Sequence, residues 1–199
     1  MSERLPEEVF FAGPNASGKS TVTDGFAVKG KYINADDIKR VLGCDDLEAA
    51  QKAETFREEC VAQKMDFTFE TVMSTDRNLN LLKKAKKTGF FVKGTYVITC
   101  DPAINIARVK HRALNGKHNV PTDKVVSRYK KSLDLLPEVL NICDVCNIYD
   151  NSDAQPVRIF KKRKNVYFFQ ETDFWKKKGI ARLTGILEEK LLPMTMLHA

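Results

Sequence analysis

The sequence predicts a three-layer α/β fold built around a central, mainly parallel sheet of five strands. Short β-branched or aromatic runs alternate with longer helical patterns along the chain, which is typical of βαβ units. The chain has 199 residues, 43% of them hydrophobic, enough for one compact domain with its own core. A glycine-rich segment separates the first predicted strand from the next helix, as in many parallel α/β folds.

We therefore expect residues 1–199 to form a single domain, with residues 102–136 as a helical lid and residues 156–199 as a C-terminal hairpin and helix. Five apolar or β-rich runs provide the strands of the sheet. They are Val9–Ala12, Lys31–Ile33, Asp66–Phe69, Phe90–Thr99 and Asn147–Tyr149.

Four helices are expected between these strands. Apolar residues at steps of three and four predict a helix over about Asp46–Lys64, and a second one that ends at Gly89. A third helix should begin at Pro102 and stop near Asn115. A fourth should follow Pro121, with Thr122 or Asp123 as its cap.

The C-terminal part predicts a hairpin of Val157–Phe160 and Val166–Phe169 around a basic turn, Lys161–Asn165. This turn could touch nucleic acid, but a charged turn that keeps an edge strand soluble is the favoured interpretation. A last amphipathic helix, from Trp175 to Leu187, is expected to pack on the sheet.

The formal net charge of +7 favours anionic partners such as nucleotides, sugar phosphates or nucleic acid. No run of about 20 apolar residues and no leader pattern is present, so we expect a cytoplasmic protein without membrane contact. The five cysteines are then expected to be reduced. Cys143 and Cys146 form a C-x-x-C pair, interpreted as two residues flanking a strand rather than a zinc site.

The sharpest motif matches G-x-x-x-x-G-K-[ST] and predicts a phosphate-binding loop. It consists of Gly13, Pro14, Asn15, Ala16, Ser17, Gly18, Lys19 and Ser20, followed by the helix residue Thr21. The glycines let backbone N–H groups and the helix N-terminus face phosphate oxygens. Lys19 is expected to reach the β- and γ-phosphates of ATP, and Ser20 to ligate Mg²⁺.

Two carboxylates follow other strands of this sheet, at the edge where ligands of parallel α/β folds bind. Asp36 follows the second strand, where Asp36 or Asp37 could equally be a helix N-cap ahead of Ile38. Glu70 follows the third strand, and we favour a role toward Mg²⁺ or substrate over an exposed strand end.

Three arginines could act as lid cations. Arg108 and Arg112 are four residues apart on one helix, and Arg128 lies on the next. Phosphoryl transfer gains from cations around the developing charge, so a lid bearing these arginines has a clear use. Spacing alone allows ordinary surface arginines equally well.

Five segments together resemble the zeta toxin family of P-loop kinases. They are Gly13–Thr21, Ile33–Asp37, Phe67–Thr71, His118–Pro121 and Tyr149–Ser152, and they span about 140 residues in the family's order. The fold class implied is the P-loop NTPase/kinase fold. The chain departs from the family in reading Val72-Met73-Ser74 after Thr71, where many relatives have a second Thr and then Leu-Ser.

The resemblance implies ATP-dependent phosphorylation of the 3′-hydroxyl of UDP-N-acetylglucosamine, held in check by a small antitoxin protein. By position, Asp36 resembles the family's general base, and Glu70, Thr71 and His118 resemble substrate-side residues. Lys19 and Ser20 resemble the ATP and Mg²⁺ residues. Asn151 belongs to a signature expected to shape the nucleotide pocket. The lid cations would be Arg108 with Arg112 or Arg128.

Two alternatives stay open. The same mechanism could serve another nucleotide-type acceptor. A non-kinase ATPase or nucleic-acid-binding switch is less expected, because the third strand ends in the single carboxylate of Glu70 rather than in the Asp-Glu pair that such ATPases commonly use. Nucleic acid is accordingly not the favoured partner.

Overall fold

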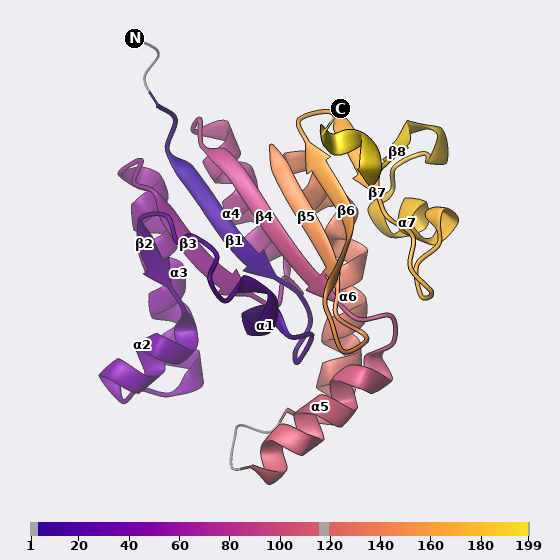
Figure 1. The fold of residues 1–199 in the computed structure, drawn as a ribbon. Helices are drawn as coiled ribbons and strands as arrows, with labels where there is room; N and C mark the ends of the chain where they lie inside the picture. Colours follow the sequence, from indigo (N-terminus) through magenta and orange to yellow (C-terminus); the bar gives the residue numbers. More distant parts are fainter. Residues whose placement is uncertain (1–3, 116–119, 199) are drawn as a thin grey trace.

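The computed structural model describes residues 4–115 and 120–198. The strands of this part of the chain form a single eight-stranded sheet (Figure 1). Its order is β2-β3-β1-β4-β5-β6-β7-β8. The strands are β1 (Glu7–Ala12), β2 (Lys31–Ile33), β3 (Phe67–Thr71), β4 (Phe91–Ile98), β5 (Val145–Asp150), β6 (Val157–Arg163), β7 (Val166–Phe169) and β8 (Leu191–Pro193).

The five predicted strands, β1 to β5, are all parallel, so the expected fold class is confirmed. The strand count needs correction. The hairpin adds β6 and β7 as antiparallel strands, and β8, which the sequence did not predict, pairs in parallel with β7. β8 has only three residues, Leu191–Pro193, too few to show an alternating pattern.

Seven α-helices surround the sheet within the described residues. They are α1 (Lys19–Thr23), α2 (Ala35–Leu42), α3 (Asp46–Ala62), α4 (Asp76–Lys87), α5 (Pro102–Leu114), α6 (Thr122–Ile142) and α7 (Lys177–Thr184). Two short 3₁₀ helices, η1 (Glu188–Lys190) and η2 (Met194–His198), flank β8. None of the described helices is long and apolar enough to span a membrane.

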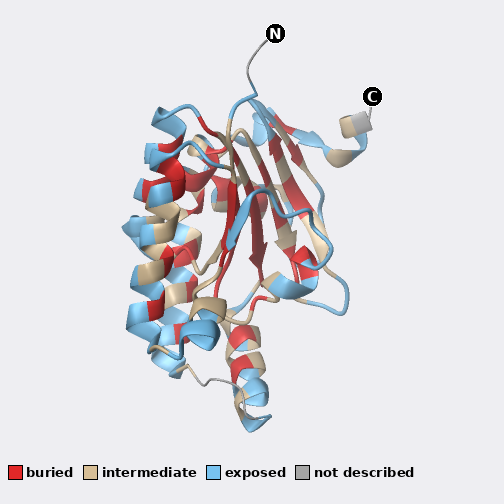
Figure 2. Cartoon of the chain, turned by 90° about the vertical axis from the view of Figure 1, so that its left-hand side faces the viewer, coloured by how far each residue is buried: buried red, intermediate tan, exposed pale blue. Residues whose placement is uncertain are grey.

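The helices cover the two faces of the sheet unequally (Figures 1 and 2). α3, α4 and α6 form a continuous layer on one face, where the buried side chains concentrate. Phe10 and Phe69 pack on this side, and the hydroxyl of buried Tyr96 donates a hydrogen bond to the backbone oxygen of Ser132 in α6. On the opposite face, Phe26 packs against Phe11 and Tyr149.

The expected cap of α6 is wrong. Pro121 occupies the N-cap position, and no side chain of the described residues caps the helix there. Thr122 is already the first helical residue, so its hydroxyl is past the position from which an N-cap accepts a hydrogen bond.

The expected basic turn is also corrected. β6 continues to Arg163, and only Lys164 and Asn165 form the turn. Lys162 lies on the covered face of the sheet, where its Nζ donates a hydrogen bond to the Leu140 oxygen at 2.5 Å. This carbonyl belongs to the last turn of α6, whose oxygens lack helical partners, so a lysine there satisfies one of them.

The last helix is shorter than expected. α7 ends at Thr184 because Gly185 adopts a left-handed conformation with φ of 69°. Ile180 of α7 joins the core cluster and Ala181 and Leu183 pack against it, and the principal contact of α7 among the helices is with α6, near Pro137. Cys143 and Cys146 flank the start of β5 as buried thiols, in agreement with the structural interpretation.

Candidate active site

The phosphate-binding loop links β1 to α1 at the carboxyl edge of the parallel strands, and two of its glycines are required by geometry. Gly13 has φ of 145°, and a Cβ there would lie 2.0 Å from the Val97 oxygen. Gly18 has φ of 89°, and a Cβ there would lie 2.0 Å from Nδ2 of Asn151. Both positions therefore exclude any side chain.

Two side-chain amides hold the loop from outside. Nδ2 of Asn151 donates a hydrogen bond to the Ser17 oxygen at 2.9 Å, and Nδ2 of Asn105 donates one to the Asn15 oxygen at 2.7 Å. Asn151 thus lies against the loop, consistent with a role in shaping the pocket. Asn105 was missed in the sequence, where its only signal is a polar residue between two isoleucines, Ile104 and Ile106.

Lys19 is folded against its own loop. Its Nζ donates hydrogen bonds to the Gly13 oxygen at 2.9 Å and the Pro14 oxygen at 3.3 Å. Burial lowers the pKa of Lys19 to about 8, and the charge of Arg112 lowers it further, while Glu70 and Asp36 act in the opposite direction. The structure therefore brings Asp36, Glu70 and Arg112 into the electrostatic range of the loop lysine.

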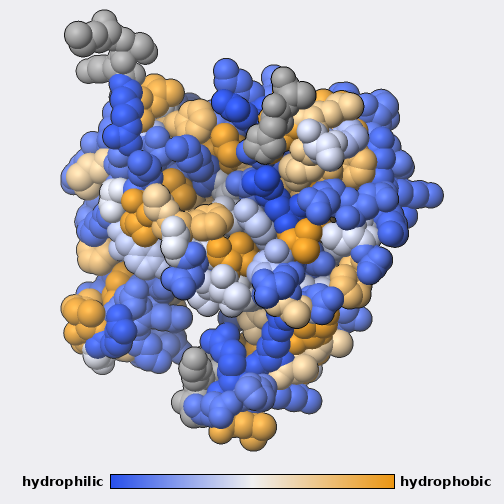
Figure 3. All heavy atoms as spheres, in the orientation of Figure 1, coloured by the Kyte–Doolittle hydropathy of each residue, from blue (hydrophilic) through white to orange (hydrophobic). Residues whose placement is uncertain are grey.

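A cavity of about 490 Å³ opens beside the loop and collects residues from five separate segments: the loop, α2, α3, α5 and the N-terminal part of α6 with the residues before it. It is lined by Asn15, Ala16, Ala35, Asp36, Lys39, Asp46, Ala49, Val109, Arg112, Val120 and Arg128. The cavity thus unites the loop with the proposed base and with two of the three arginines. In the space-filling view a notch separates the α2 region from the α5 region (Figure 3).

Asp36 is in the first turn of α2, but neither it nor Asp37 caps the helix. The N-cap is Asn34, whose Oδ1 accepts a hydrogen bond from the Asp36 N–H at 2.9 Å. Asp37 forms an ion pair with Arg40 at 2.6 Å. The capping alternative is therefore wrong, and Asp36 is the carboxylate of this pair that lines the cavity.

Glu70 and Thr71 end β3 and both have partners within the protein. The hydroxyl of Tyr32 donates a hydrogen bond to Oε1 of Glu70. Burial, followed by this hydrogen bond, raises the pKa of Tyr32 to about 12. Oγ1 of Thr71 accepts hydrogen bonds from the Met73 N–H and from Nδ2 of Asn78, at 2.9 and 2.7 Å. Thr71 therefore shapes the turn after β3.

The three arginines separate. Arg112 and Arg128 line the cavity, and Nη1 of Arg128 is 3.5 Å from Oδ1 of Asn15. Arg108 instead donates from Nη2 to the Asn151 oxygen at 2.8 Å, and its buried Nη1 has no hydrogen-bond partner. Of the other predicted residues, Ser20 and Thr21 are exposed on the first turn of α1, and His118 lies outside the described residues.

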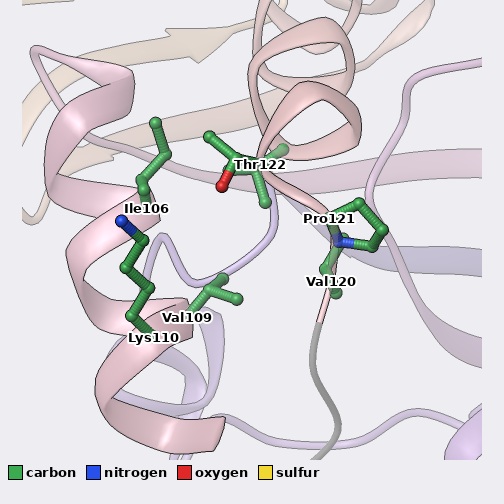
Figure 4. A pocket seen from close by; sticks show the side chains of 7 residues that line it. Ile106, Val109, Lys110, Val120, Pro121 and Thr122 are labelled. Atoms are coloured by element: carbon green, nitrogen blue, oxygen red, sulfur yellow. The ribbon is translucent and has the colours of Figure 1, made fainter.

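A second hollow of about 140 Å³ lies between α5 and α6 (Figure 4). Its lining is mostly apolar: Ile106, Val109, Lys110, Val120, Pro121, Thr122 and Val125. Val109 and Val120 also line the large cavity, so the two hollows adjoin. The middle of α5 and the first turn of α6 are therefore not tightly packed against each other.

No protein-family model matches the chain. A Haemophilus influenzae protein described only as uncharacterized is 29% identical over 135 residues, which are 61% of this chain and 91% of that protein. Among solved structures, a chain of the AvrRxo1-ORF1:ORF2 complex with ATP aligns with a TM-score of 0.67 and 15% identity. The alignment covers 90% of this chain and 64% of that chain.

Two further solved structures share the architecture. One, from the PezAT chromosomal toxin-antitoxin system of Streptococcus pneumoniae, has a TM-score of 0.52, 18% identity, and coverage of 78% of this chain and 73% of that chain. The other belongs to the Pnkp1/Rnl/Hen1 RNA repair complex, with a TM-score of 0.55 and 11% identity over 79% of this chain and 49% of that one. The fold is thus that of the P-loop kinases.

Proposed function

We propose that this chain is an ATP-dependent kinase that phosphorylates a hydroxyl group of a small molecule. One observation supports this proposal above the others. A single cavity is lined by the phosphate loop at Asn15 and Ala16, by the carboxylate of Asp36, and by the guanidinium groups of Arg112 and Arg128. These are the groups that a phosphoryl transfer needs on its donor side, its acceptor side and around the developing charge.

The chemistry assigns one task to each group. Asp36 orients the acceptor hydroxyl and accepts its proton as the oxygen attacks the γ-phosphorus, and the bond from that phosphorus to the bridging oxygen breaks so that ADP leaves. Lys19 leaves the Gly13 and Pro14 oxygens to contact the phosphates of ATP, and Arg112 and Arg128 compensate the charge of the transferred group. The charges of Arg112, Glu70 and Asp36 act on the pKa of Lys19, and this proximity supports placing Lys19 at the centre of the site.

The donor atoms near the loop fit Mg²⁺. This ion prefers oxygen ligands, and it is usually held by one or two protein groups together with substrate phosphates and water. Ser20 is exposed in the first turn of α1, and Glu70 supplies a carboxylate within electrostatic range of Lys19. When bound, Mg²⁺ would neutralise phosphate charge during transfer.

The acceptor that we propose is a nucleotide sugar, with UDP-N-acetylglucosamine first. This choice rests on the resemblance of the five segments to zeta toxins, and the departure at Val72–Ser74 lies in the loop directly after Glu70 and Thr71. The toxin-antitoxin origin of one structural neighbour supports a small antitoxin protein as a partner. We place the reaction in the cytoplasm, where ATP is supplied.

The proposal is tested by incubating the purified protein with ATP, Mg²⁺ and a panel of nucleotide sugars, nucleotides and short RNA oligonucleotides. Mass spectrometry should show the gain of one phosphate on a nucleotide sugar. Lys19→Ala is the control and should abolish the transfer. ATP hydrolysis that nucleic acid stimulates, with no phosphorylated product, would instead favour the switch and contradict the kinase proposal.

A further inference from the structure

Four hydrogen bonds form a closed circuit through the phosphate loop and the two lid helices. The Tyr129 hydroxyl of α6 donates to the Thr99 oxygen at 2.6 Å, and Oγ1 of Thr99 donates to Oδ1 of Asn105 in α5 at 2.5 Å. Nδ2 of Asn105 donates to the Asn15 oxygen, and Oδ1 of Asn15 faces Nη1 of Arg128 at 3.5 Å. Arg128 is the sequence neighbour of Tyr129, which closes the circuit.

Asn105 is the member whose orientation the circuit fixes completely. Its side chain and that of Thr99 are fully buried, so neither can exchange its partner for water. The Asn15 oxygen can only accept a hydrogen bond, so the amide nitrogen of Asn105 must face it and the amide oxygen must face the Thr99 hydroxyl. A flipped amide would place its oxygen against the Asn15 oxygen and leave both acceptors without a donor.

Two members of the circuit contact Asn15, one at its backbone oxygen and one at its side chain. Its backbone oxygen is held by Asn105, while its side chain contacts Arg128 in the wall of the large cavity. Displacing the oxygen would move both the loop amides that follow it and the partner of Arg128. The hydrogen bond from Asn151 to the Ser17 oxygen holds the other side of the loop, and neither of these two residues belongs to the circuit.

We propose that Asn105 is a positioning residue that holds the phosphate loop in its binding conformation and couples it to Arg128 of the lid. Its part in phosphoryl transfer rests on the proposed function, whereas its effect on the loop does not. A loop held from outside in this way needs little rearrangement when phosphate binds, so affinity for nucleotide should depend on a residue that does not touch the nucleotide.

The test compares Asn105→Asp with the wild type by amide hydrogen exchange without nucleotide. Aspartate has the same shape but places an oxygen against the Asn15 oxygen, so the two groups repel. Exchange at residues 15–20 should accelerate by roughly tenfold, while the amides of β4 stay protected. Asn115→Asp is the matched control, because within residues 4–115 and 120–198 that exposed amide bonds only to the His111 oxygen at the end of the same helix.

Thr99→Val is the second variant, in case Asn105→Asp loses its fold. It keeps the size of the side chain and removes the hydroxyl, which donates to Oδ1 of Asn105 at 2.5 Å and lies 3.3 Å from the Asp101 oxygen, so the loop should again exchange faster than in the wild type. Unchanged loop exchange in a folded Asn105→Asp protein, or in Thr99→Val if the first variant unfolds, overturns the proposal.

ATP binding supplies a separate readout. In a double-mutant cycle, Asn105→Asp should weaken ATP about tenfold, and Arg128→Ala should cost less in the Asn105→Asp background than in the wild type, because the coupling is already lost. Additive effects would contradict the coupling. A wild-type protein that binds no ATP, but whose loop still loosens in Asn105→Asp, would refute the proposed function and leave the loop brace standing.

Discussion

The hydroxyl of Tyr32 in β2 donates a hydrogen bond across the strand pair to Oε1 of Glu70 in β3, at 2.5 Å. This contact holds one oxygen of the Glu70 carboxylate, whose charge raises the pKa of Lys19. The other oxygen of that carboxylate takes no part in the contact. The Tyr32 hydroxyl also accepts a hydrogen bond from Nδ2 of Asn34, the N-cap of the helix that bears Asp36. Tyr32 thus connects Glu70 to the start of that helix.

Tyr32→Phe should consequently lower phosphoryl transfer while leaving the fold intact, because only the hydroxyl is removed. We expect turnover to fall by roughly ten- to a hundredfold, in line with the loss of a hydrogen bond to a charged group. Tyr167→Phe, on β7 and away from the site, is the control. Equal turnover in both variants would show that the orientation of Glu70 does not matter for transfer.

Gly18→Ala should remove nucleotide binding, because the new methyl group would overlap Nδ2 of Asn151 and the backbone has a positive φ. Gly25→Ala is a matched control: its φ is 81°, but nothing lies within 4 Å of the added Cβ. It should cost about 1 kcal/mol of stability without affecting ATP affinity. Titration with a fluorescent ATP analogue and thermal melts of both variants provide the comparison, and similar ATP affinities would refute the steric argument.

The lowered pKa of Lys19, about 8, gives ATP affinity a pH dependence. The lysine is charged below this pKa and neutral above it, so affinity should decline as the pH rises from 7 to 9. Folding stability should change in the opposite direction, because the unfolded chain keeps the proton up to about 10.5 and stability then rises with pH over this window. Lys19→Arg stays charged and should show a flatter affinity profile. Parallel profiles in the two proteins would exclude Lys19 as the titrating group.

Glu8 should destabilise the protein at alkaline pH. Its side chain is fully buried, neither carboxylate oxygen has a hydrogen-bond partner, and burial raises its pKa from 4.5 to about 8. The folded state therefore binds this proton more strongly than the unfolded state, and the stability it retains at low pH is lost as the pH rises through 8. Glu8→Gln should raise the melting temperature at pH 8.5 more than at pH 5.5. Glu7→Gln, beside Lys93, is the control, and the same shift in both variants would contradict the assignment.

The parts of the site that the sequence predicted are those encoded locally. Gly13 and Gly18 are needed because of their own backbone angles and close neighbours, and the parallel strands necessarily carry Asp36 and Glu70 to one edge of the sheet. The five parallel strands could be predicted for a similar reason, since each is a local run rich in β-branched, aromatic or other apolar residues.

The parts that the sequence did not predict depend on contacts between distant segments. Asn105 is 90 residues from Asn15, and Tyr32 is 38 residues from Glu70, so no local pattern reports either contact. Lys162 appeared to belong to a charged turn, because nothing in its neighbourhood shows that its amine satisfies a carbonyl at the end of α6. Spacing placed Arg108 and Arg112 on one helix face, but only tertiary packing separates their partners.

Asp36→Asn is the measurement that tests the kinase mechanism most directly. Asn34 provides the cap of α2, so the substitution leaves capping and size unchanged and removes only the proton acceptor. Asp37→Asn, at the neighbouring residue paired with Arg40, is the matched control. With ATP affinity and melting temperature measured alongside, phosphorylation of the acceptor should fall by about 10²- to 10⁴-fold in Asp36→Asn alone. Transfer at the wild-type rate in a folded, ATP-binding Asp36→Asn protein would contradict the general-base role and the mechanism built on it.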